Sequence, residues 1–316
     1  MIKAFIINKV AGNGKKSEKI LPKIKKLANK NPNIKIYITE GEKDATIIAE
    51  ALCRKSRAEG KNIDIFACGG DGTLSEVCNG IIGYENVRLG IIPTGSGNDF
   101  IRNFGEQKEF LNLKNQFTDN TRKADLIKCT LHLEGKDIIR YCINGINIGF
   151  DGNTVVDAHR LRKLPFIAGS FSYLLSVFVN FLKKTGANLE VYVDGEMIHS
   201  GKLLLCTASN GRFCGGGIES CPNAEINDGI GDLLIVKNVS RKTFAKAFPA
   251  FKKGKLFNIS EIENLAIYRK FKKASVKLCG REKNFVIDGE EVKAESLDIE
   301  ILKNYLRIIV PNNNIQ

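Results

Sequence analysis

The chain has 316 residues, of which 43% are hydrophobic and 26% charged, and this composition excludes wholesale disorder and allows a substantial core. Its formal net charge of +13, from 48 basic and 35 acidic residues, favours anionic partners such as a nucleotide or an acidic membrane surface. The sequence has no tryptophan for base stacking and no motif that reads RNA or DNA, so nucleic acid is not an expected partner.

The first part of the chain alternates strand-like and helix-like segments. The predicted strands are Ile2–Asn8, Ile34–Thr39, Ile63–Ala67 and Val87–Ile92, and the predicted helices are Ser17–Ala28, Asp44–Lys55 and Leu74–Ile82, with a further helix opening at Ser96–Asp99. This order predicts an α/β domain over residues 1–124, with a parallel sheet covered by helices. Ligands bind at the carboxyl ends of the strands in such sheets, so the loops that follow the strands should converge there.

After Asp125 the strand-like runs lie close together, and Asp-Gly turns separate several of them. These runs are Leu126–Leu133, Ile138–Ile148, Leu189–Val193, Leu203–Ala208 and Leu233–Val236. The pattern predicts a mainly antiparallel β-sandwich domain over residues 125–316, with the extreme C-terminus packed back on the first domain.

The cysteines and the N-terminus indicate a cytoplasmic protein. Nine cysteines, without paired CxxC spacing, are typical of free thiols in a reducing compartment. Five lie in apolar strand-like runs, where we expect burial: Cys68, Cys129, Cys142, Cys206 and Cys279. The N-terminus runs directly into a strand, without a basic n-region or a cleavage site, which argues against secretion.

Two glycine-rich loops carry the strongest functional signal. In Gly69-Gly70-Asp71-Gly72-Thr73 an apolar strand breaks into a turn that opens a helix, whose free N–H groups and positive dipole end suit a phosphate. Asp71 places a carboxylate where a magnesium ion that bridges phosphates would need a ligand. A second loop of the same kind, Thr94-Gly95-Ser96-Gly97-Asn98-Asp99, follows the next strand.

These loops resemble those of the diacylglycerol kinase catalytic domain family, which includes bacterial soluble lipid kinases, sphingosine kinases and ceramide kinases. Further motifs follow in the order of that family: Asn8-Lys9-Val10-Ala11-Gly12, Asn210-Gly211, Asp228-Gly229-Ile230-Gly231-Asp232 and Asp288-Gly289-Glu290. Lys9 stands where proline is usual, and Ser75 where many relatives have asparagine, whereas Glu76 is retained. The resemblance spans nearly the whole chain and implies an NAD-kinase-like first domain.

The resemblance also implies roles for individual residues. The nucleotide ATP would be bound by Asn8, Gly12, Gly69, Gly70, Gly72, Thr73, Glu76, Thr94, Gly95, Ser96, Gly97 and Asn98. Asp71 would bind magnesium directly or through water. Asp99, Arg102 and Asp125 would form a charge network that orders the active site, and the spacing of Asp99 and Arg102 also suits a pair on one helix face.

Asp288 is the predicted general base for the lipid hydroxyl, with Glu290 as its acidic neighbour. The tripeptide Asp-Gly-Glu occurs twice, and Asp194-Gly195-Glu196 reads as a simple hairpin turn, so only the order of the family motifs selects Asp288. The loop of Asp228, Ile230 and Asp232 could wrap a hard cation. The resemblance implies a structural magnesium ion there in some bacterial members, and a turn without metal stays open.

The predicted function is ATP- and magnesium-dependent phosphorylation of a lipid hydroxyl, with diacylglycerol as the leading acceptor. The expected partners are a lipid substrate and anionic phospholipid headgroups at the inner membrane face; a homodimer has only the resemblance as support. One alternative is an NAD-kinase-type phosphotransferase, which shares Gly-Gly-Asp-Gly but not Thr94–Asp99 with a downstream Asp-Gly-Glu. The other is a non-catalytic nucleotide- or lipid-binding protein, against which the retained carboxylates of Asp71, Asp99 and Asp288 argue.

One uncharged segment, Pro165–Leu182, is followed by Lys183 and Lys184 and touches the lower length limit of a spanning helix. It contains a proline, a glycine, serines and an asparagine, which favours a buried or interfacial helix instead. Two interpretations stay open: a core helix, or an interfacial helix that lines the lipid entry with its basic ends on anionic headgroups.

Overall fold

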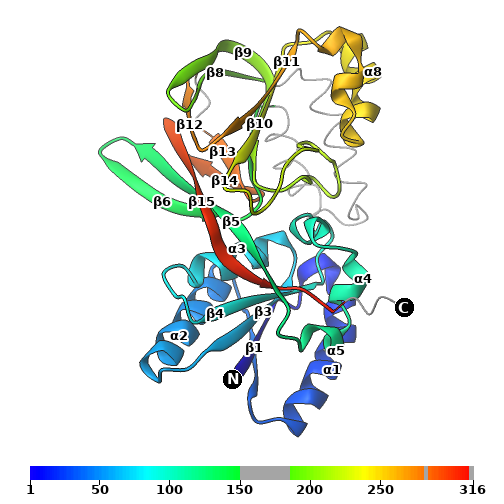
Figure 1. Ribbon diagram of the computed structural model, residues 1–316, viewed down its shortest axis with the longest axis vertical. Helices are drawn as coiled ribbons and strands as arrows, with labels where there is room; N and C mark the ends of the chain where they lie inside the picture. The colour runs from blue at the N-terminus through cyan, green and yellow to red at the C-terminus, as the bar shows by residue number, and fades with distance from the viewer. Residues whose placement is uncertain (150–185, 281–283, 313–316) are drawn as a thin grey trace. The chain divides into compact units, whose positions relative to one another are not determined.

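The structure is a computed structural model that describes residues 1–149, 186–280 and 284–312 (Figure 1). The chain forms two compact units, the first of Met1–Ala124 with Asn304–Gln316 and the second of Asp125–Lys303. The segment Pro165–Leu182 lies outside the described residues. Among the helices that are described, none combines the length and the apolar character needed to cross a membrane.

The first unit is a parallel sheet with helices on both faces, in the strand order β2-β1-β3-β4-β15. Its strands are β1 (Ile2–Ile7), β2 (Ile34–Ile38), β3 (Ile63–Gly69), β4 (Val87–Pro93) and the C-terminal part of β15 (Ser296–Ile309). Its helices are α1 (Lys15–Lys30), α2 (Asp44–Ala58), α3 (Asp71–Gly80), α4 (Gln107–Phe110) and α5 (Leu113–Gln116), with 3₁₀ turns at Ala11–Asn13 and Phe100–Asn103. The strand β15 joins this sheet in parallel to β4, where Ile308 lies opposite Leu89.

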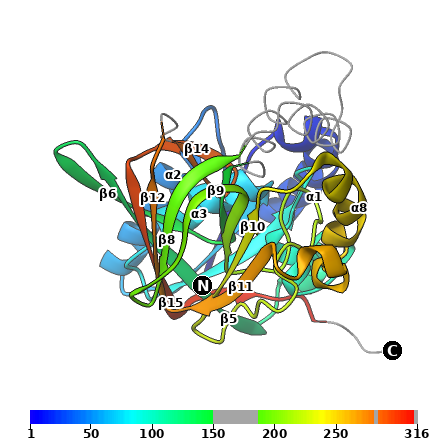
Figure 2. The ribbon, with the colours of Figure 1, turned by 90° about the horizontal axis from the view of Figure 1, so that it is seen from above.

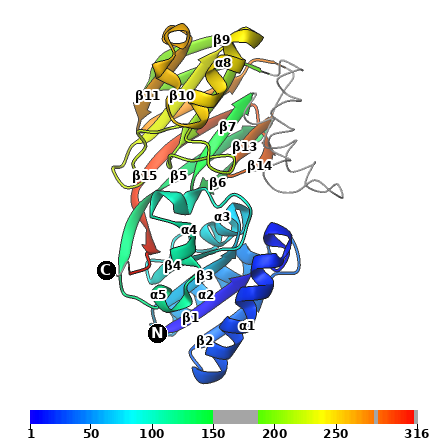
Figure 3. The same cartoon turned by 90° about the vertical axis from the view of Figure 1, so that its right-hand side faces the viewer.

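Helix α1 covers one face of this sheet and runs alongside β1 and β2 (Figure 3). Its lysines point to solvent, whereas Ile20 and Ile24, four positions apart on its buried face, pack into a cluster with Phe5 and Phe66. The rings of Phe5 and Phe66 stack with centroids 4.6 Å apart. Helices α2 and α3 pack tightly against each other, because a Cβ at Gly80 would lie 2.4 Å from the Thr46 carbonyl oxygen.

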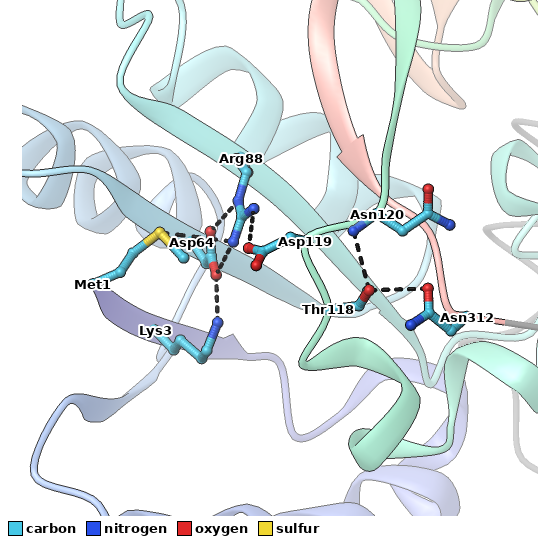
Figure 4. Close-up of polar contacts among 8 residues, drawn as sticks. All are labelled: Met1, Lys3, Asp64, Arg88, Thr118, Asp119, Asn120 and Asn312. Atoms are coloured by element: carbon cyan, nitrogen blue, oxygen red, sulfur yellow. Dashed lines mark hydrogen bonds and ion pairs between the residues drawn. The ribbon is translucent and has the colours of Figure 1, made fainter.

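A buried ion pair joins three adjacent strands of the first unit (Figure 4). Asp64 on β3 is fully buried and lies opposite Lys3 on β1 and Arg88 on β4. Its carboxylate accepts from Lys3 Nζ at 2.6 Å and from Arg88 Nε at 2.7 Å and Nη2 at 3.0 Å. Arg88 also pairs with the exposed Asp119 at 2.9 Å. The strand register therefore places the Asp64 carboxylate between two cations. A buried carboxylate needs such partners, because an unpaired buried charge is strongly destabilising.

The predicted alternation of strands and helices in the first unit is confirmed, with two corrections. Helix α3 begins at Asp71, three residues before the predicted start at Leu74. The helix predicted to open at Ser96–Asp99 is wrong, because Asn98 adopts a left-handed backbone with a φ of 51°. The 3₁₀ turn Phe100–Asn103 follows it directly, so these residues form a loop rather than the start of an α-helix.

The second unit is an antiparallel β-sandwich (Figure 2). Its strands are β5 (Thr121–Leu133), β6 (Lys136–Cys142), β7 (Gly145–Gly149), β8 (Ala187–Val193), β9 (Glu196–Ser209), β10 (Gly231–Lys237), β11 (Ala266–Phe271), β12 (Lys273–Leu278), β13 (Asn284–Ile287), β14 (Glu290–Lys293) and the first part of β15. The order is β14-β13-β7-β9-β8-β12-β15, while β10 pairs with β9 and β11, and β5 pairs with β15 and β6. One large apolar cluster fills the interior, where Phe271 and Phe285 are buried.

A second apolar cluster lies between strands β9–β11 and helix α8 (Arg241–Lys252), which covers them (Figure 2). Ser240 caps α8 by accepting from the Thr243 N–H at 3.0 Å. Phe251 is the buried anchor of the helix, and Phe244 and Phe248 stack beside it with centroids 5.5 Å apart.

Two expectations for the second unit are wrong. The run Ile138–Ile148 is not one strand, because the chain turns at Ile143 and Asn144 and thereby separates β6 from β7. Cys279 is exposed beyond the end of β12, whereas the other eight cysteines are buried free thiols. Its apolar neighbours in sequence belong to a strand that ends one residue earlier.

Candidate active site

The glycine loops of the first unit contact each other at the carboxyl end of its sheet. A Cβ at Gly12 would lie 2.4 Å from the Thr94 carbonyl oxygen, and one at Gly95 would lie 2.3 Å from the Gly70 Cα. The Thr94 and Gly95 N–H groups both donate to the Gly69 carbonyl, at 2.9 and 3.1 Å. Only glycine permits this approach, so backbone atoms rather than side chains form the surface where the three loops meet.

Side chains hold these loops in place. Asn8 Nδ2 donates to Thr73 Oγ1 at 3.1 Å and so ties the first loop to the start of α3. Asn98 Nδ2 donates to the Gly95 carbonyl at 2.8 Å within the second glycine loop, Thr94–Asp99. The hydroxyl of Thr94 is buried and has no hydrogen-bond partner in the part of the chain that is described. An unpartnered hydroxyl between backbone amides and a helix N-terminus fits a phosphate oxygen as its partner.

Asp71, Asp99 and Arg102 form a charged cluster beside this surface. Asp71, the first residue of α3, accepts from the Asp99 N–H at 2.8 Å and from the Phe100 N–H at 3.4 Å. Loss of hydration and the nearby Asp99 carboxylate raise the pKa of Asp71 to about 7. Asp99 pairs with Arg102 at 3.5 Å, as its spacing predicts, and Arg102 also donates to the Gly97 carbonyl at 3.2 Å.

Four further residues of the first unit differ in how they relate to the glycine loops. Lys16 Nζ donates to the Gly95 carbonyl at 3.4 Å, so its cation reaches the second glycine loop. Ser96 is exposed at the tip of that loop, and Gly72 faces open space. Glu76 points elsewhere: its carboxylate accepts from the Ala45 N–H at 3.2 Å, at the start of α2. The geometry therefore gives Glu76 a helix-capping contact.

In the second unit, Asp288 occupies the hairpin between β13 and β14 with a φ of 48°. Its carboxylate accepts from three successive backbone N–H groups, those of Ile143 at 2.8 Å, Asn144 at 2.9 Å and Gly145 at 3.3 Å. The buried Cys142 thiol donates to the same carboxylate at 3.1 Å. Asp288 thus holds the turn between β6 and β7 in its observed shape.

A hydrogen-bond chain connects this turn to the other family motifs of the second unit. Asn210 Nδ2 donates to the Ile143 carbonyl at 3.0 Å and to the Asp125 carbonyl at 2.9 Å. The fully buried Asp125 carboxylate accepts in turn from the Gly229 N–H at 2.6 Å. Motifs that are about a hundred residues apart in sequence are therefore parts of one buried network.

Glu290 directly follows the Asp288-Gly289 turn, at the start of β14. Its side chain is 43% exposed and forms an ion pair with the guanidinium of Arg140 on β6. That pair is one cause of the raised pKa of Arg140, although burial of the guanidinium opposes the rise. Glu290 therefore presents a carboxylate oriented by a cation at the surface of this network.

The other Asp-Gly-Glu turn has the same backbone geometry in an exposed place. Asp194 has a φ of 47° and accepts from the Lys272 and Lys273 N–H groups at 3.2 and 2.8 Å. Its carboxylate stabilises the connection between β11 and β12 as Asp288 stabilises the one between β6 and β7. The network of Asn210 and Asp125 includes the Asp288 turn.

The Asp228–Asp232 loop offers a mixed donor set for a cation. Asp228 pairs with Lys270 at 3.2 Å and accepts from the Ile230 N–H at 2.9 Å. Asp232 is fully buried, and burial raises the pKa of its carboxyl. Across the described ranges, no three His, Cys, Asp or Glu side chains gather closely enough to hold a metal ion. A cation here would depend on backbone carbonyls and on displacement of Lys270.

Several residues of this network are not predicted as site residues from the sequence. They are the turn Ile143-Asn144-Gly145 and the side chains of Arg140, Cys142 and Asn210. The dipeptide Asn144-Gly145 is a strong turn signal, and it would have divided the run Ile138–Ile148 correctly. Sequence spacing does not reveal the partners of Asp288, because they lie in and beside a turn more than 140 residues earlier in the chain.

Comparison with known proteins agrees with this arrangement. Residues 3–129 match the diacylglycerol kinase catalytic domain, and residues 144–310 match the YegS C-terminal NAD kinase beta sandwich-like domain. A diacylglycerol kinase of Staphylococcus haemolyticus is 28% identical over 281 residues, which cover 88% of this chain and 78% of that protein.

Solved structures share the fold over almost the whole length. A crystal structure of a diacylglycerol kinase from Bacillus anthracis superposes with a TM-score of 0.66 at 24% identity, covering 98% of this chain and 97% of that one. The yeast NADH kinase in complex with NADH has a TM-score of 0.52 at 10% identity, covering 98% and 82%. The first unit therefore has the NAD-kinase-like fold. One domain model matches each unit, and the second matches more than half of the chain. This protein therefore belongs to the lipid kinase family that combines a diacylglycerol kinase catalytic domain with a YegS-type C-terminal β-sandwich domain.

Proposed function

We propose that the protein transfers the γ-phosphoryl group of ATP to the hydroxyl of a lipid, with magnesium as the metal and diacylglycerol as the acceptor. The observation that carries the proposal is the surface of bare backbone in the first unit, where Gly12, Gly70 and Gly95 meet at the N-terminus of α3. Phosphoryl transfer requires mainly positioning and charge neutralisation, which backbone N–H groups and a helix terminus supply.

The residues of the first unit would divide the work as follows. The N–H groups of the glycine loops and the unpartnered Thr94 hydroxyl would bind the phosphates. Asp71 would provide the carboxylate for magnesium, which neutralises charge on the transferring group when bound. Arg102 would keep Asp99 oriented, and Lys16 would add a cation at the second loop.

The residues of the second unit would receive the lipid hydroxyl. As the oxygen of the alcohol forms its bond to the γ-phosphorus, the bond to the β–γ bridging oxygen breaks and ADP leaves. The hydroxyl proton must then pass to a carboxylate. Within the Asp288-Gly289-Glu290 turn the geometry favours Glu290, because both oxygens of Asp288 already accept backbone N–H groups. Asp288 would act by positioning that turn.

The proposal includes a peripheral place at the inner face of the cytoplasmic membrane and a role in phospholipid synthesis, where diacylglycerol becomes phosphatidic acid. The net charge of +13 supports attraction to anionic headgroups. The NAD-kinase-like fold makes NAD the acceptor against which the lipid must be tested.

The test measures transfer of labelled phosphate from ATP to diacylglycerol, sphingosine, ceramide and phosphatidylglycerol in mixed micelles, and to NAD in solution. We expect labelled phosphatidic acid, its loss in Asp71→Asn and Glu290→Gln, and its retention in Asp194→Asn. Labelled NAD alone would reassign the protein to the NAD kinases. ATP binding without transfer to any acceptor would contradict the catalytic role.

A further inference from the structure

We infer that the outer face of α8, together with the loop that follows it, is the surface by which this protein docks on an anionic lipid bilayer. The inference rests on the proposed lipid kinase function, since a lipid acceptor requires contact with a membrane. It concerns a surface of the second unit that carries none of the catalytic motifs.

The charge of this segment is one-sided. Between Asp232 and Glu261 the sequence has no acidic residue and seven basic ones. These are Lys237, Arg241, Lys242, Lys246, Lys252, Lys253 and Lys255, and all but Lys237 are exposed. A run of this kind at the end and outer face of a helix complements a negatively charged plane.

Among the described residues, ion pairs neutralise only part of this charge. Lys246 pairs with Glu261. Within the part of the chain that the structure describes, no ion pair is made by the other four lysines of α8 and its following loop: Lys242, Lys252, Lys253 and Lys255. Uncompensated charges cost little while they remain in water, and they gain attraction when anionic headgroups approach.

Exposed apolar side chains lie beside these lysines. This combination is typical of a surface that binds a membrane, whereas charged residues alone are typical of a surface that faces water. Phe257 is 43% exposed and rests edge-on against Tyr268, with ring centroids 6.0 Å apart. Ala245 and Pro249 are exposed on the outer face of α8 between the lysines. The inner face is already occupied, because Ala247 and Phe251 pack into the second apolar cluster. The helix can therefore lie flat on a bilayer without unfolding.

Helix α1 is the matched comparison, since its exposed face also carries many lysines. It differs in two respects: its first turn contains Glu18, and its sequence has no aromatic residue. If charge alone decided membrane binding, the two helices would bind a bilayer equally well. The combination of lysines with the exposed Phe257 instead favours the α8 surface.

The experiment measures sedimentation of the full chain with vesicles of equal parts phosphatidylglycerol and phosphatidylcholine, and with pure phosphatidylcholine vesicles. The α8 variant replaces Lys242, Lys252, Lys253 and Lys255 with Gln. The control variant replaces Lys19, Lys23, Lys26 and Lys30 of α1 with Gln, which removes the same charge from a helix of the other unit. Gln keeps nearly the helix propensity of Lys, so folding is preserved in both.

Each lysine near an anionic surface contributes roughly five-fold in affinity, so the α8 variant should bind anionic vesicles at least about ten-fold more weakly. The control should change by less than about two-fold, and Phe257→Ser should weaken binding at high salt, where charge is screened. Equal losses in the two lysine variants would show bulk charge instead of a docking surface and would overturn the inference. The inference would also be overturned if the α8 variant bound anionic vesicles as well as the wild type does, or if the wild type bound neutral vesicles just as strongly.

A kinase assay on a short-chain, water-dispersed diacylglycerol separates this inference from the proposed function. The α8 variant should keep wild-type turnover there, because none of its changed residues lies in the catalytic machinery. If the wild type phosphorylates no lipid in any form, the proposed function fails, while the vesicle comparison still decides whether α8 docks on a bilayer.

Discussion

Asp288→Asn should destabilise the second unit strongly, whereas Asp194→Asn should hardly affect it. The two residues share a left-handed hairpin position and a carboxylate that accepts backbone N–H groups. At Asp288 the carboxylate accepts three such groups and a thiol in a half-buried setting. An Asn side chain keeps one accepting oxygen and turns an NH₂ group toward N–H donors.

The size of the effect follows from these contacts. Hydrogen bonds to charged groups contribute about 1.5–3 kcal/mol each, so the loss of two of them at position 288 should lower the free energy of unfolding by roughly 3–6 kcal/mol. Asp194 is exposed, and water replaces its lost contacts, so about 1 kcal/mol or less is expected there.

The assay is urea unfolding followed by circular dichroism of the β-structure, with the midpoints compared at equal slope. Equal losses in the two variants would refute the argument that burial and the Asn210 network distinguish the turns. A loss below about 1 kcal/mol for Asp288→Asn would refute the argument that this carboxylate holds the β6–β7 turn.

Three further outcomes are expected in the first unit. Gly12→Ala should abolish ATP binding measured by calorimetry, because the new Cβ would lie 2.4 Å from the Thr94 carbonyl oxygen and Gly12 has a φ of +61°. Unchanged ATP binding would contradict the close approach of the loops. Because the pKa of Asp71 is raised to about 7, the folded protein keeps this proton longer than the unfolded chain does, so the free energy of unfolding should fall as pH rises from about 4 to 7. Magnesium-dependent nucleotide binding should weaken below about pH 7, where the Asp71 carboxyl is protonated. Asp71→Asn should remove both dependences, and a pH-independent wild type would be inconsistent with that pKa. Asp64→Asn should cost about 3–5 kcal/mol in thermal or urea unfolding, whereas Asp119→Asn, at an exposed ion pair, should cost less than about 1 kcal/mol.

The sequence predicts the first unit well, because amphipathic helices and buried strands alternate with a clear period. Helix α1 shows this, since its buried residues Ser17, Ile20 and Ile24 are three and four positions apart among lysines. The glycine loops were predicted to converge because strand ends meet at one edge of a parallel sheet, and the contacts between Gly12, Gly70 and Gly95 have that origin.

The second unit was harder to predict, because long-range antiparallel pairing leaves little local signal. The apolar run Ile138–Ile148 conceals the turn that Asp288 holds, although the turn is fixed by partners far along the chain. The Glu76 carboxylate shows the opposite difficulty. A motif position beside phosphate-loop residues reaches a neighbouring helix instead, and only the fold shows the direction of its side chain.

The placement of β15 has a consequence for the order in which the protein can mature during synthesis. Ile308 and Ile309 are fully buried in the first unit, where Ile309 joins the cluster of Phe5 and Phe66. The ribosome releases the N-terminal strands long before these residues. Until β15 is synthesised, the edge of the sheet at β4 therefore has no strand to pair with. Nascent chains arrested before residue 304 should therefore remain sensitive to protease in the segment that has already emerged, and they should become resistant only after the last strand is released.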